Sequence, residues 1–351
     1  MEIALTPLEA GEYIAKQSVA VTVYVDKCQG IAKQIMDSIT DGTIGDIEYK
    51  ANPLHPKGLS DEQHLNWVFV LDTLNFSFWP NEDEEYYVDY KDNREVGYLA
   101  MCAAFMKAHE AEIPIYDTDW MVTVTEEALG KILVSGSGHA IPLLRERFRA
   151  LKESGQWLNM KHRGQMMNAV RACGPSAQSL LRSIMTIESF RDQTMYKGTK
   201  VWLLKRAQIL VADVYSLLKG STTQEVRDLV NYVDIDTITM FADYRVPQAL
   251  CHLGIMEYSP ELRLRLDKKE VMPYGDEMEM EIRGCSIFAV NEIFKEVIRM
   301  RLNDYKGLDW YETKRPLFAI DIDVWLWQYR RQHAEEVEEH VPFHRCREIY
   351  Y

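Results

Sequence analysis

The sequence predicts a mainly α-helical protein with few or short strands. Apolar residues recur at three- and four-residue spacing over long stretches, whereas alternating, strand-like patterns stay short. Hydrophobic residues make up 47% of the 351 residues, which is enough to bury a large core. No loop is long enough to be a free linker. We therefore expect one domain over residues 1–351, with the functional site between its N-terminal and C-terminal halves.

Proline, glycine and acidic clusters predict the principal loops at 41–45, 52–60, 81–85 and 272–277. Between the loops, residues 65–74 are mostly apolar and fit either a helix or a buried strand, while 120–125 alternate weakly like a short strand. The stretch SGSGHA at 135–140 lacks the third glycine of a dinucleotide-binding fingerprint. It indicates a flexible turn before a helix that Pro142 begins.

Two later segments have the periodicity of core helices. The apolar face of the first comprises Leu204, Ala207, Val211, Val214 or Tyr215, and Leu218. That of the second comprises Ile287, Val290, Ile293 or Phe294, Val297 and Met300. Residues 318–324 alternate like a strand, but the pattern continues through VWLWQYRRQ past strand length. We interpret this segment as the start of a third helix.

The formal net charge of -14 argues against a protein that grips nucleic-acid polymers, because each phosphate contact requires a basic side chain. Six dispersed cysteines form no CxxC pair, which predicts reduced thiols and neither a zinc site nor a disulfide framework. The N-terminal stretch has acidic residues and no apolar core, and no later stretch has membrane-span length. We expect a cytoplasmic protein that needs no membrane, cofactor, metal or obligate protein partner.

The segment TMFADYRVPQALCHLG at 239–254 places Asp243 and Arg245 between an apolar run and Pro247. Proline disfavours helical geometry in the residue before it, so Asp243 is expected near a helix break, where it can face a pocket. A carboxylate there could stabilise a cationic sugar or attack its anomeric carbon, with Arg245 as a neighbouring substrate contact. Alternatively, Asp243 caps the following helix or pairs with Arg245.

Aromatic residues cluster in NWVFVLDTLNFSFWP at 66–80. Phe76, Phe78 and Trp79 beside the amide of Asn75 offer the flat surfaces and hydrogen bonds that bind a heteroaromatic base. Asn75 and Trp79 are therefore candidate substrate contacts. Packing in the core is the alternative.

Basic residues gather in VWLLKRAQILVADVY at 201–215. Lys205 and Arg206, with Gln208 nearby and Asp213 on the face of Arg206, could hold one phosphate on a rigid helix. The alternative is a helix with a solvated basic stripe.

Two carboxylates lie close together in FAIDIDVWLWQYRR at 318–331. Asp321 and Asp323 would raise one another's pKa if both pointed inward, as in an acid and base pair. Alternatively, one lies at the surface and the other in the core.

Five blocks occur together in a recognisable order. They are DTLNFSFW at 72–79, KRAQILVAD at 205–213, FADYRVPQ at 241–248, EIRGCSI at 281–287 and PFHRCREIYY at 342–351. In these blocks the chain resembles the queuosine salvage family, and FADYRVPQ is the most specific of them. The resemblance implies a metal-free hydrolase that releases queuine from queuosine 5′-monophosphate, or from queuosine, for tRNA modification. It also implies a helical fold similar to the helix-hairpin-helix DNA glycosylases.

The resemblance assigns roles to individual positions. It makes Asp243 the catalytic carboxylate, places Phe241 against the base and gives Asp323 a contact to the base. The next two base-contact positions carry Val324 and Gln328, where some members have an aromatic residue and an acid.

The chemistry of the residues agrees with these roles. Positive charge builds on the ribose as the bond to the base breaks, so an ionised Asp243 beneath the sugar would lower the barrier. Asp323 would accept the N–H donors of the guanine-like edge, and Lys205 would hold the 5′-phosphate. These roles require a carboxylate at 243 that lies near 241 and 323 and is not locked in an ion pair. Two alternatives remain, namely a noncatalytic module that binds modified nucleosides or a tRNA enzyme, and an enzyme that repairs duplex DNA.

Overall fold

The computed structural model describes residues 4–41, 52–80, 85–304 and 316–351. Of these residues, 59% are helical and 8% lie in strands, so the predicted fold class is confirmed. Two compact units are present, and each contains segments that are distant in sequence. The first unit contains 1–46, 192–205 and 235–347, and the second contains 47–191, 206–234 and 348–351. The single domain and the likeness to DNA glycosylases stay predictions.

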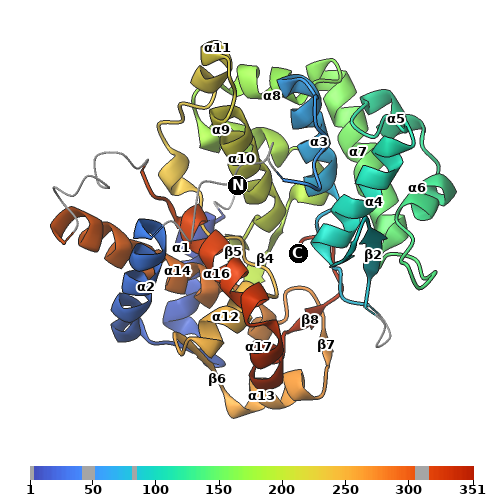
Figure 1. Ribbon diagram of the computed structural model, residues 1–351. Helices are drawn as coiled ribbons and strands as arrows, with labels where there is room; N and C mark the ends of the chain where they lie inside the picture. Colours follow the sequence, from blue (N-terminus) through green and yellow to red (C-terminus); the bar gives the residue numbers. More distant parts are fainter. Residues whose placement is uncertain (1–3, 42–51, 81–84, 305–315) are drawn as a thin grey trace. The chain divides into compact units, whose positions relative to one another are not determined.

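The first unit is built around one long helix. Its helices are α1 (Pro7–Gln17), α2 (Cys28–Thr40), α12 (Val246–His252), α13 (Pro260–Asp267), α14 (Glu277–Asn303), α16 (Ala319–Gln332) and α17 (Ala334–His340), with short 3-10 turns at Val25–Lys27 and Ile235–Thr237. Helices α1, α2, α12 and α16 all pack on α14, and Figure 1 shows α1, α2 and α16 around it.

The sequence of α14 explains its central place. The side chain of Asp276 caps its first turn, and the predicted apolar face of 287–300 is buried or partly buried in the core. Two glycines let α1 approach closely: a Cβ at Gly284 would lie 2.5–2.7 Å from three atoms of Ile14, and one at Gly11 would lie 2.8 Å from Ile287. The block EIRGCSI therefore sits at a tight helix crossing.

Short strands complete the first unit. Antiparallel pairs join β1 (Val21–Val23) to β6 (Met256–Tyr258) and β4 (Gln193–Tyr196) to β5 (Thr199–Trp202), and a parallel pair joins β7 (Val271–Met272) to β8 (Arg345–Cys346). Lys197 and Gly198 turn the β4–β5 hairpin with positive φ angles of 44° and 81°.

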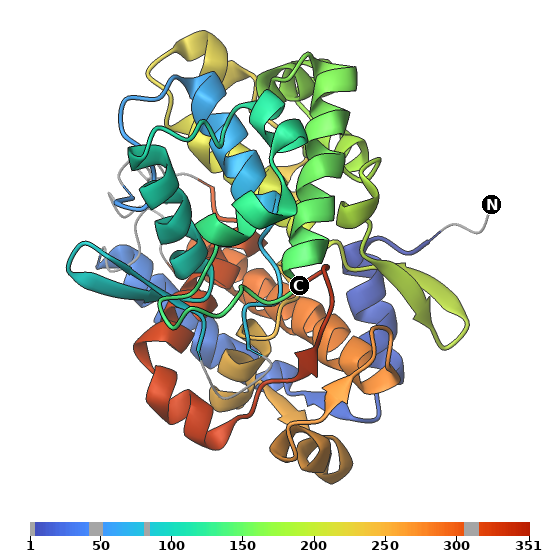
Figure 2. The same cartoon turned by 90° about the vertical axis from the view of Figure 1, so that its right-hand side faces the viewer.

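The second unit is also helical. It contains α3 (Asp61–Thr73), α4 (Tyr98–Glu110), α5 (Thr118–Thr123), α6 (Glu126–Ile132), α7 (Leu144–His162), α8 (Met166–Cys173), α9 (Ala177–Ile184), a 3-10 turn at Glu188–Phe190, α10 (Lys205–Lys219, whose first residue belongs to the first unit) and α11 (Gln224–Asp228). A hairpin of β2 (Tyr87–Tyr90) and β3 (Asn93–Val96) packs on α4. Helix α7 packs against α3, α5, α6 and α8, and Figure 2 shows it in green beside the blue α3.

The structure settles the open element predictions. Residues 65–74 belong to helix α3 and its C-terminal cap; a capping box of Ser60 and Gln63 begins the helix, and residues 64–73 are all buried. The strand-like interpretation of 120–125 is wrong, because Asp117 caps a short helix, α5, that covers 118–123. The helical interpretation from 318 onward is confirmed by α16, and the apolar face predicted from 204 is buried apart from the half-buried Tyr215.

The predicted loops are also found where the structure describes them. Residues 52–60 contain no helix or strand, and 272–277 is a turn flanked by the end of β7 and the start of α14. The turn at 135–140 is tight, with Gly138 at φ 87°, and helix α7 begins two residues after Pro142. The loops at 41–45 and 81–85 fall almost wholly outside the described residues.

The described residues contain neither a membrane span nor a cluster of metal ligands. No helix there is long and apolar enough to cross a membrane. Within the same residues, no group of three or more His, Cys, Asp or Glu side chains could hold a metal ion.

Candidate active site

The segment 241–243 is a tight turn held from both sides within the first unit. The N–H of Asp243 donates to the carbonyl of Phe241 over 2.7 Å, which closes a three-residue turn around Ala242. The N–H of Phe241 donates to Oδ1 of Asp323 (2.9 Å), and the carbonyl of Ala242 accepts from Nε of Arg283 (2.9 Å). The chain on the N-terminal side of Asp243 is therefore fixed at two consecutive residues.

Asp243 presents one oxygen to the protein and keeps the other available. Its Oδ1 accepts the N–H groups of Arg245 and Val246, both at 2.8 Å, where α12 begins. Among the described residues, Oδ2 accepts no hydrogen bond and the side chain forms no ion pair with Arg245. Asp243 thus supports the start of α12 from two residues before its N-cap, Arg245, and these bonds occupy only one of its two oxygens. Asp243 itself is half-buried.

Asp323 is buried beside the turn at 241–243. Only 5% of it is exposed, and its Oδ1 accepts the N–H of Phe241. Burial and the negative charge of Asp243 raise the pKa of Asp323 well above its usual value, against the opposing effects of the Phe241 N–H and of Lys205. Asp323 therefore carries a proton at a pH where an exposed carboxyl would be ionised. These effects on Asp323 indicate that Asp243 and Lys205 each lie near it.

Asp321 binds the backbone at the start of its own helix. It is half-buried, and its Oδ2 accepts the N–H of Phe318 (2.7 Å) at the start of α16. Asp323 thus lies in the core, as the second interpretation predicts, whereas Asp321 is half-buried at the N-terminal end of the helix and not at the surface.

The basic residues at the start of α10 are buried, so the solvated-stripe alternative is wrong. Lys205 is 6% exposed, and its backbone N–H donates to Oδ2 of Asp192 (3.3 Å) in the first unit. Arg206 belongs to the second unit, where it donates to the carbonyls of Asp72, Thr73 and Ser189. The structure thus separates the roles of two adjacent basic residues. Gln208 and Asp213 are buried in the second unit.

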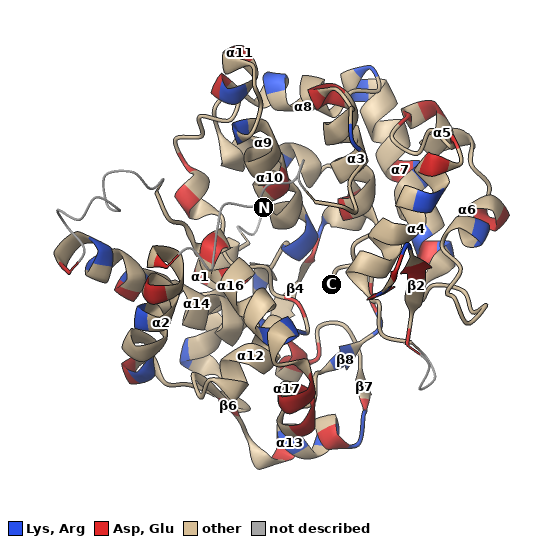
Figure 3. Ribbon diagram, viewed as in Figure 1, with Lys and Arg blue, Asp and Glu red and all other residues tan. Residues whose placement is uncertain are grey.

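Arg245 is engaged by the acidic helix α17. Its Nη1 donates to Glu338 (2.9 Å) and Gln248 (3.0 Å), and its guanidinium lies over the ring of Phe343, 4.5 Å from the centroid. Helix α17 carries four glutamates in the seven residues AEEVEEH, shown in red in Figure 3. A substrate contact by Arg245 stays a prediction.

The remaining candidates divide between the units. Val324 and Gln328 are half-buried on α16 and lie one and five residues after Asp323. Among the described residues, the Gln328 amide makes no hydrogen bond. Asn75 is half-buried and Trp79 is buried, and both follow α3 in the second unit. Their predicted contacts to a base stay predictions.

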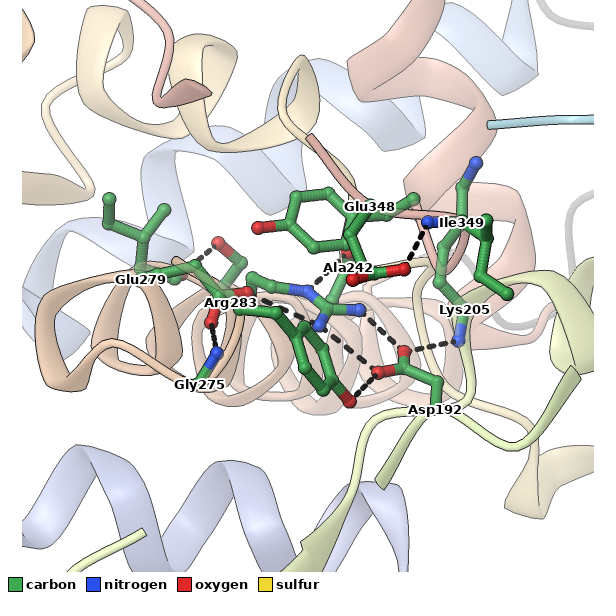
Figure 4. Close-up of polar contacts among 12 residues, drawn as sticks. Asp192, Lys205, Ala242, Gly275, Glu279, Arg283, Glu348 and Ile349 are labelled. Carbon is green, nitrogen blue, oxygen red and sulfur yellow. Dashed lines mark hydrogen bonds and ion pairs between the residues drawn. The ribbon is translucent and has the colours of Figure 1, made fainter. Parts of the chain in front are cut away.

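Sequence reasoning missed the buried ion pair of Arg283 and Asp192. Nη2 of Arg283 lies 2.6 Å from Oδ2 of Asp192, and Nη1 lies 3.2 Å from its Oδ1. The hydroxyl of Tyr274 also donates to Asp192 (2.9 Å). Figure 4 shows Arg283 between Asp192 and Ala242. A signal was present, because Arg283 precedes Ile287 by four residues on the core face of α14 and a buried arginine needs a carboxylate partner.

Comparisons with known proteins identify the family of this chain. The family model described as "Queuosine salvage protein" matches residues 54–351. A Bos taurus protein named "Queuosine 5'-phosphate N-glycosylase/hydrolase" is 38% identical over 354 residues, covering 100% of both chains. Proteins of the same name from Mus musculus and Schizosaccharomyces pombe are 38% and 34% identical and cover 98–99% of this chain and 99% of their own length. The chain belongs to the queuosine salvage protein family.

Two of the family blocks meet inside the second unit. The hydroxyl of Ser77, in the block DTLNFSFW, donates to the carbonyls of Glu348 (2.8 Å) and Tyr351 (3.3 Å) in the C-terminal block. Arg147 supports the same loop by donating to the carbonyls of Leu74, Phe76 and Ser77. This member of the queuosine salvage family therefore uses the loop after α3 to bind its own C-terminus. The relatives named above all carry an enzyme's name, and the noncatalytic alternative has no support from them.

Proposed function

We propose that this chain hydrolyses the N-glycosidic bond of queuosine 5′-phosphate and releases queuine. The names of its full-length relatives support this activity. The observation that carries the proposal is the pairing of Asp243, which keeps one carboxylate oxygen available, with the buried Asp323. The available oxygen of Asp243 can stabilise positive charge and Asp323 is suited to hold a proton, as cleavage of the bond between sugar and base requires.

Asp243 acts on the sugar. As the bond from C1′ to the base nitrogen breaks, its electron pair leaves with the base and C1′ becomes positively charged. The second oxygen of Asp243 stabilises that charge, because its partner oxygen is fixed by two N–H groups and the carboxylate needs little reorganisation. Water then bonds to C1′ and gives up one proton, while the base gains one.

Asp323 acts on the base. A protonated carboxyl carries an O–H donor and a carbonyl acceptor side by side, and the guanine-like edge of queuine has an acceptor oxygen beside an N–H donor. Such a carboxyl fits this edge better than the carboxylate that the sequence predicts, which could only accept. The hydrogen bond to the base oxygen strengthens as negative charge builds on the leaving base.

Lys205 is our candidate for the 5′-phosphate. It is nearly buried, and its charge already acts on Asp323, so it belongs to the group of residues around the two carboxylates. An ammonium in such a place would bind phosphate more strongly than one in water. Phe241, whose N–H is fixed by Asp323, would line the base.

We also propose that the substrate is a free nucleotide rather than a nucleic-acid polymer. The chain has 54 acidic and 40 basic residues, a balance that disfavours the many phosphate contacts of polymer binding. A cytoplasmic location, predicted from the sequence, fits a substrate that arises from tRNA turnover.

One incubation tests the activity. The protein is mixed with queuosine 5′-monophosphate, and free queuine and ribose 5-phosphate are measured by chromatography. We expect both products in equal amounts. Binding without release would favour a noncatalytic module, and release of damaged bases from duplex DNA instead would favour a repair enzyme.

A further inference from the structure

Arg283 donates to three different segments of the first unit. Its side chain on α14 is fully buried, Nε donates to the carbonyl of Ala242 (2.9 Å), and the two terminal nitrogens hold Asp192. Nη1 also lies 3.4 Å from Oε1 of Glu279, one helical turn earlier. Figure 4 shows the guanidinium at the centre of these contacts.

Asp192 extends the connection to the start of α10. It is 2% exposed, and each of its oxygens accepts from Arg283 and from one other donor. These other donors are the hydroxyl of Tyr274 and the backbone N–H of Lys205. The residue before Lys205, Leu204, has a positive φ of 54°, so the chain at this point adopts a conformation that contacts must maintain.

Two segments that bear proposed site residues therefore meet at one guanidinium. One is the turn at Ala242, directly before Asp243. The other is the backbone of Lys205, through Asp192. Since the guanidinium is planar and its nitrogens are fixed relative to one another, it sets the spacing of the groups that it binds.

We propose that Arg283 is a positioning residue of the reaction and that it fixes Asp243 relative to Lys205. This inference rests on the proposed function. The decisive contact is the bond from Nε to Ala242. The ion pair of Arg283 with Asp192 neutralises two buried charges, and the stability of the fold alone requires such a pair. The Nε bond, in contrast, reaches the residue next to the proposed catalytic carboxylate.

Arg283→Lys is the first test, because lysine keeps the charge but has a single nitrogen and cannot bind both Asp192 and Ala242 as the fork does. We expect kcat to fall about 100-fold, as for a misplaced catalytic group, with KM changed less than about threefold. Arg265→Lys is the matched control. Arg265 binds two carboxylates, Glu270 and Asp276, in the same unit without contacting the turn at 241–243, and its variant should keep the wild-type kcat.

A triple variant separates positioning from folding. Arg283→Met with Asp192→Asn and Glu279→Gln removes the three buried charges together, because Glu279 is also fully buried and lies 3.4 Å from Arg283. The amide oxygen introduced at position 192 can still accept from the backbone N–H of Lys205, and the amide NH2 can donate to the hydroxyl of Tyr274, but the bond to Ala242 is gone. We expect a folded protein, by circular dichroism and thermal melting, with the same loss of kcat. A wild-type kcat in either folded variant would overturn the inference, as would a loss seen only in KM.

The activity of the wild-type enzyme distinguishes a failure of the proposed function from a failure of the positioning role of Arg283. If wild-type protein releases no queuine from queuosine 5′-monophosphate, the proposed function fails before Arg283 is tested. If wild-type protein is active and the folded Arg283 variants match it, the function stands and the positioning role is wrong.

Discussion

Replacing Asp243 by asparagine tests the proposed mechanism with little disturbance of the fold. The carbonyl oxygen of asparagine can still accept the N–H groups of Arg245 and Val246, which Oδ1 of Asp243 now accepts at 2.8 Å. Asparagine and aspartate cap helices about equally well, so we expect the free energy of unfolding to change by less than about 1 kcal/mol. Alanine would remove the cap as well and confuse the two effects.

The rate should fall steeply. Asp243 is half-buried, so an effective dielectric constant near that of a protein surface applies. Opposite unit charges about 4 Å apart then attract by about 4 kcal/mol. Since about 1.4 kcal/mol corresponds to a factor of ten in rate, loss of the charge should lower kcat about 1,000-fold.

The pH dependence should change with it. The negative charge of Asp243 raises the pKa of Asp323, so Asp243→Asn lowers that pKa. Asp323 must be protonated to donate to the base, and the alkaline limb of any residual activity should move to lower pH. The assay is queuine release measured across pH, with thermal melting as the control for folding. A folded variant with a kcat within about threefold of wild type would refute the reasoning.

Three further predictions concern neighbouring residues. The folded protein holds the proton of Asp323 at a pH where the unfolded chain has lost it, so this group lowers stability as pH rises above about 4. Asp323→Asn should therefore gain stability relative to wild type as pH rises above about 4 in urea titrations, and a difference that does not change with pH would contradict this. Lys205→Ala should weaken turnover of queuosine 5′-monophosphate more than that of queuosine, and an equal loss in steady-state kinetics would speak against a phosphate role. Asp321→Ala removes the acceptor of the Phe318 N–H and should cost about 1 kcal/mol of stability at unchanged kcat, which melting and turnover together measure.

Periodicity in the sequence predicted the helices that build the cores. The faces of 287–300 and 204–218 are set by apolar spacing alone, and both are buried or partly buried in α14 and α10. Segment 65–74 remained ambiguous because residues 67–71 form an unbroken apolar run, which removes the periodic signal. Ser60 was the clue that a helix begins there. The strand prediction for 120–125 was wrong because helix α5, with six residues, is too short to display a helical period.

The site was predictable only in part. A helix break beside Asp243 follows from Pro247, and the resemblance supplied Phe241 and Asp323. Sequence reasoning could not show that Asp243 acts on Asp323, since the two lie 80 residues apart and their proximity depends on how α12 and α16 pack. For the same reason the sequence did not show that Asp192 binds Arg283, because the two residues lie 91 positions apart.

A structure of the Asp243→Asn protein with bound queuosine 5′-monophosphate tests the central claim most directly. We predict the anomeric carbon about 3–3.5 Å from the side chain at 243, the distance of a group poised to act, with the guanine-like edge on Asp323. A nucleotide bound with its sugar away from residue 243, or with its base remote from Asp323, would contradict the proposed mechanism.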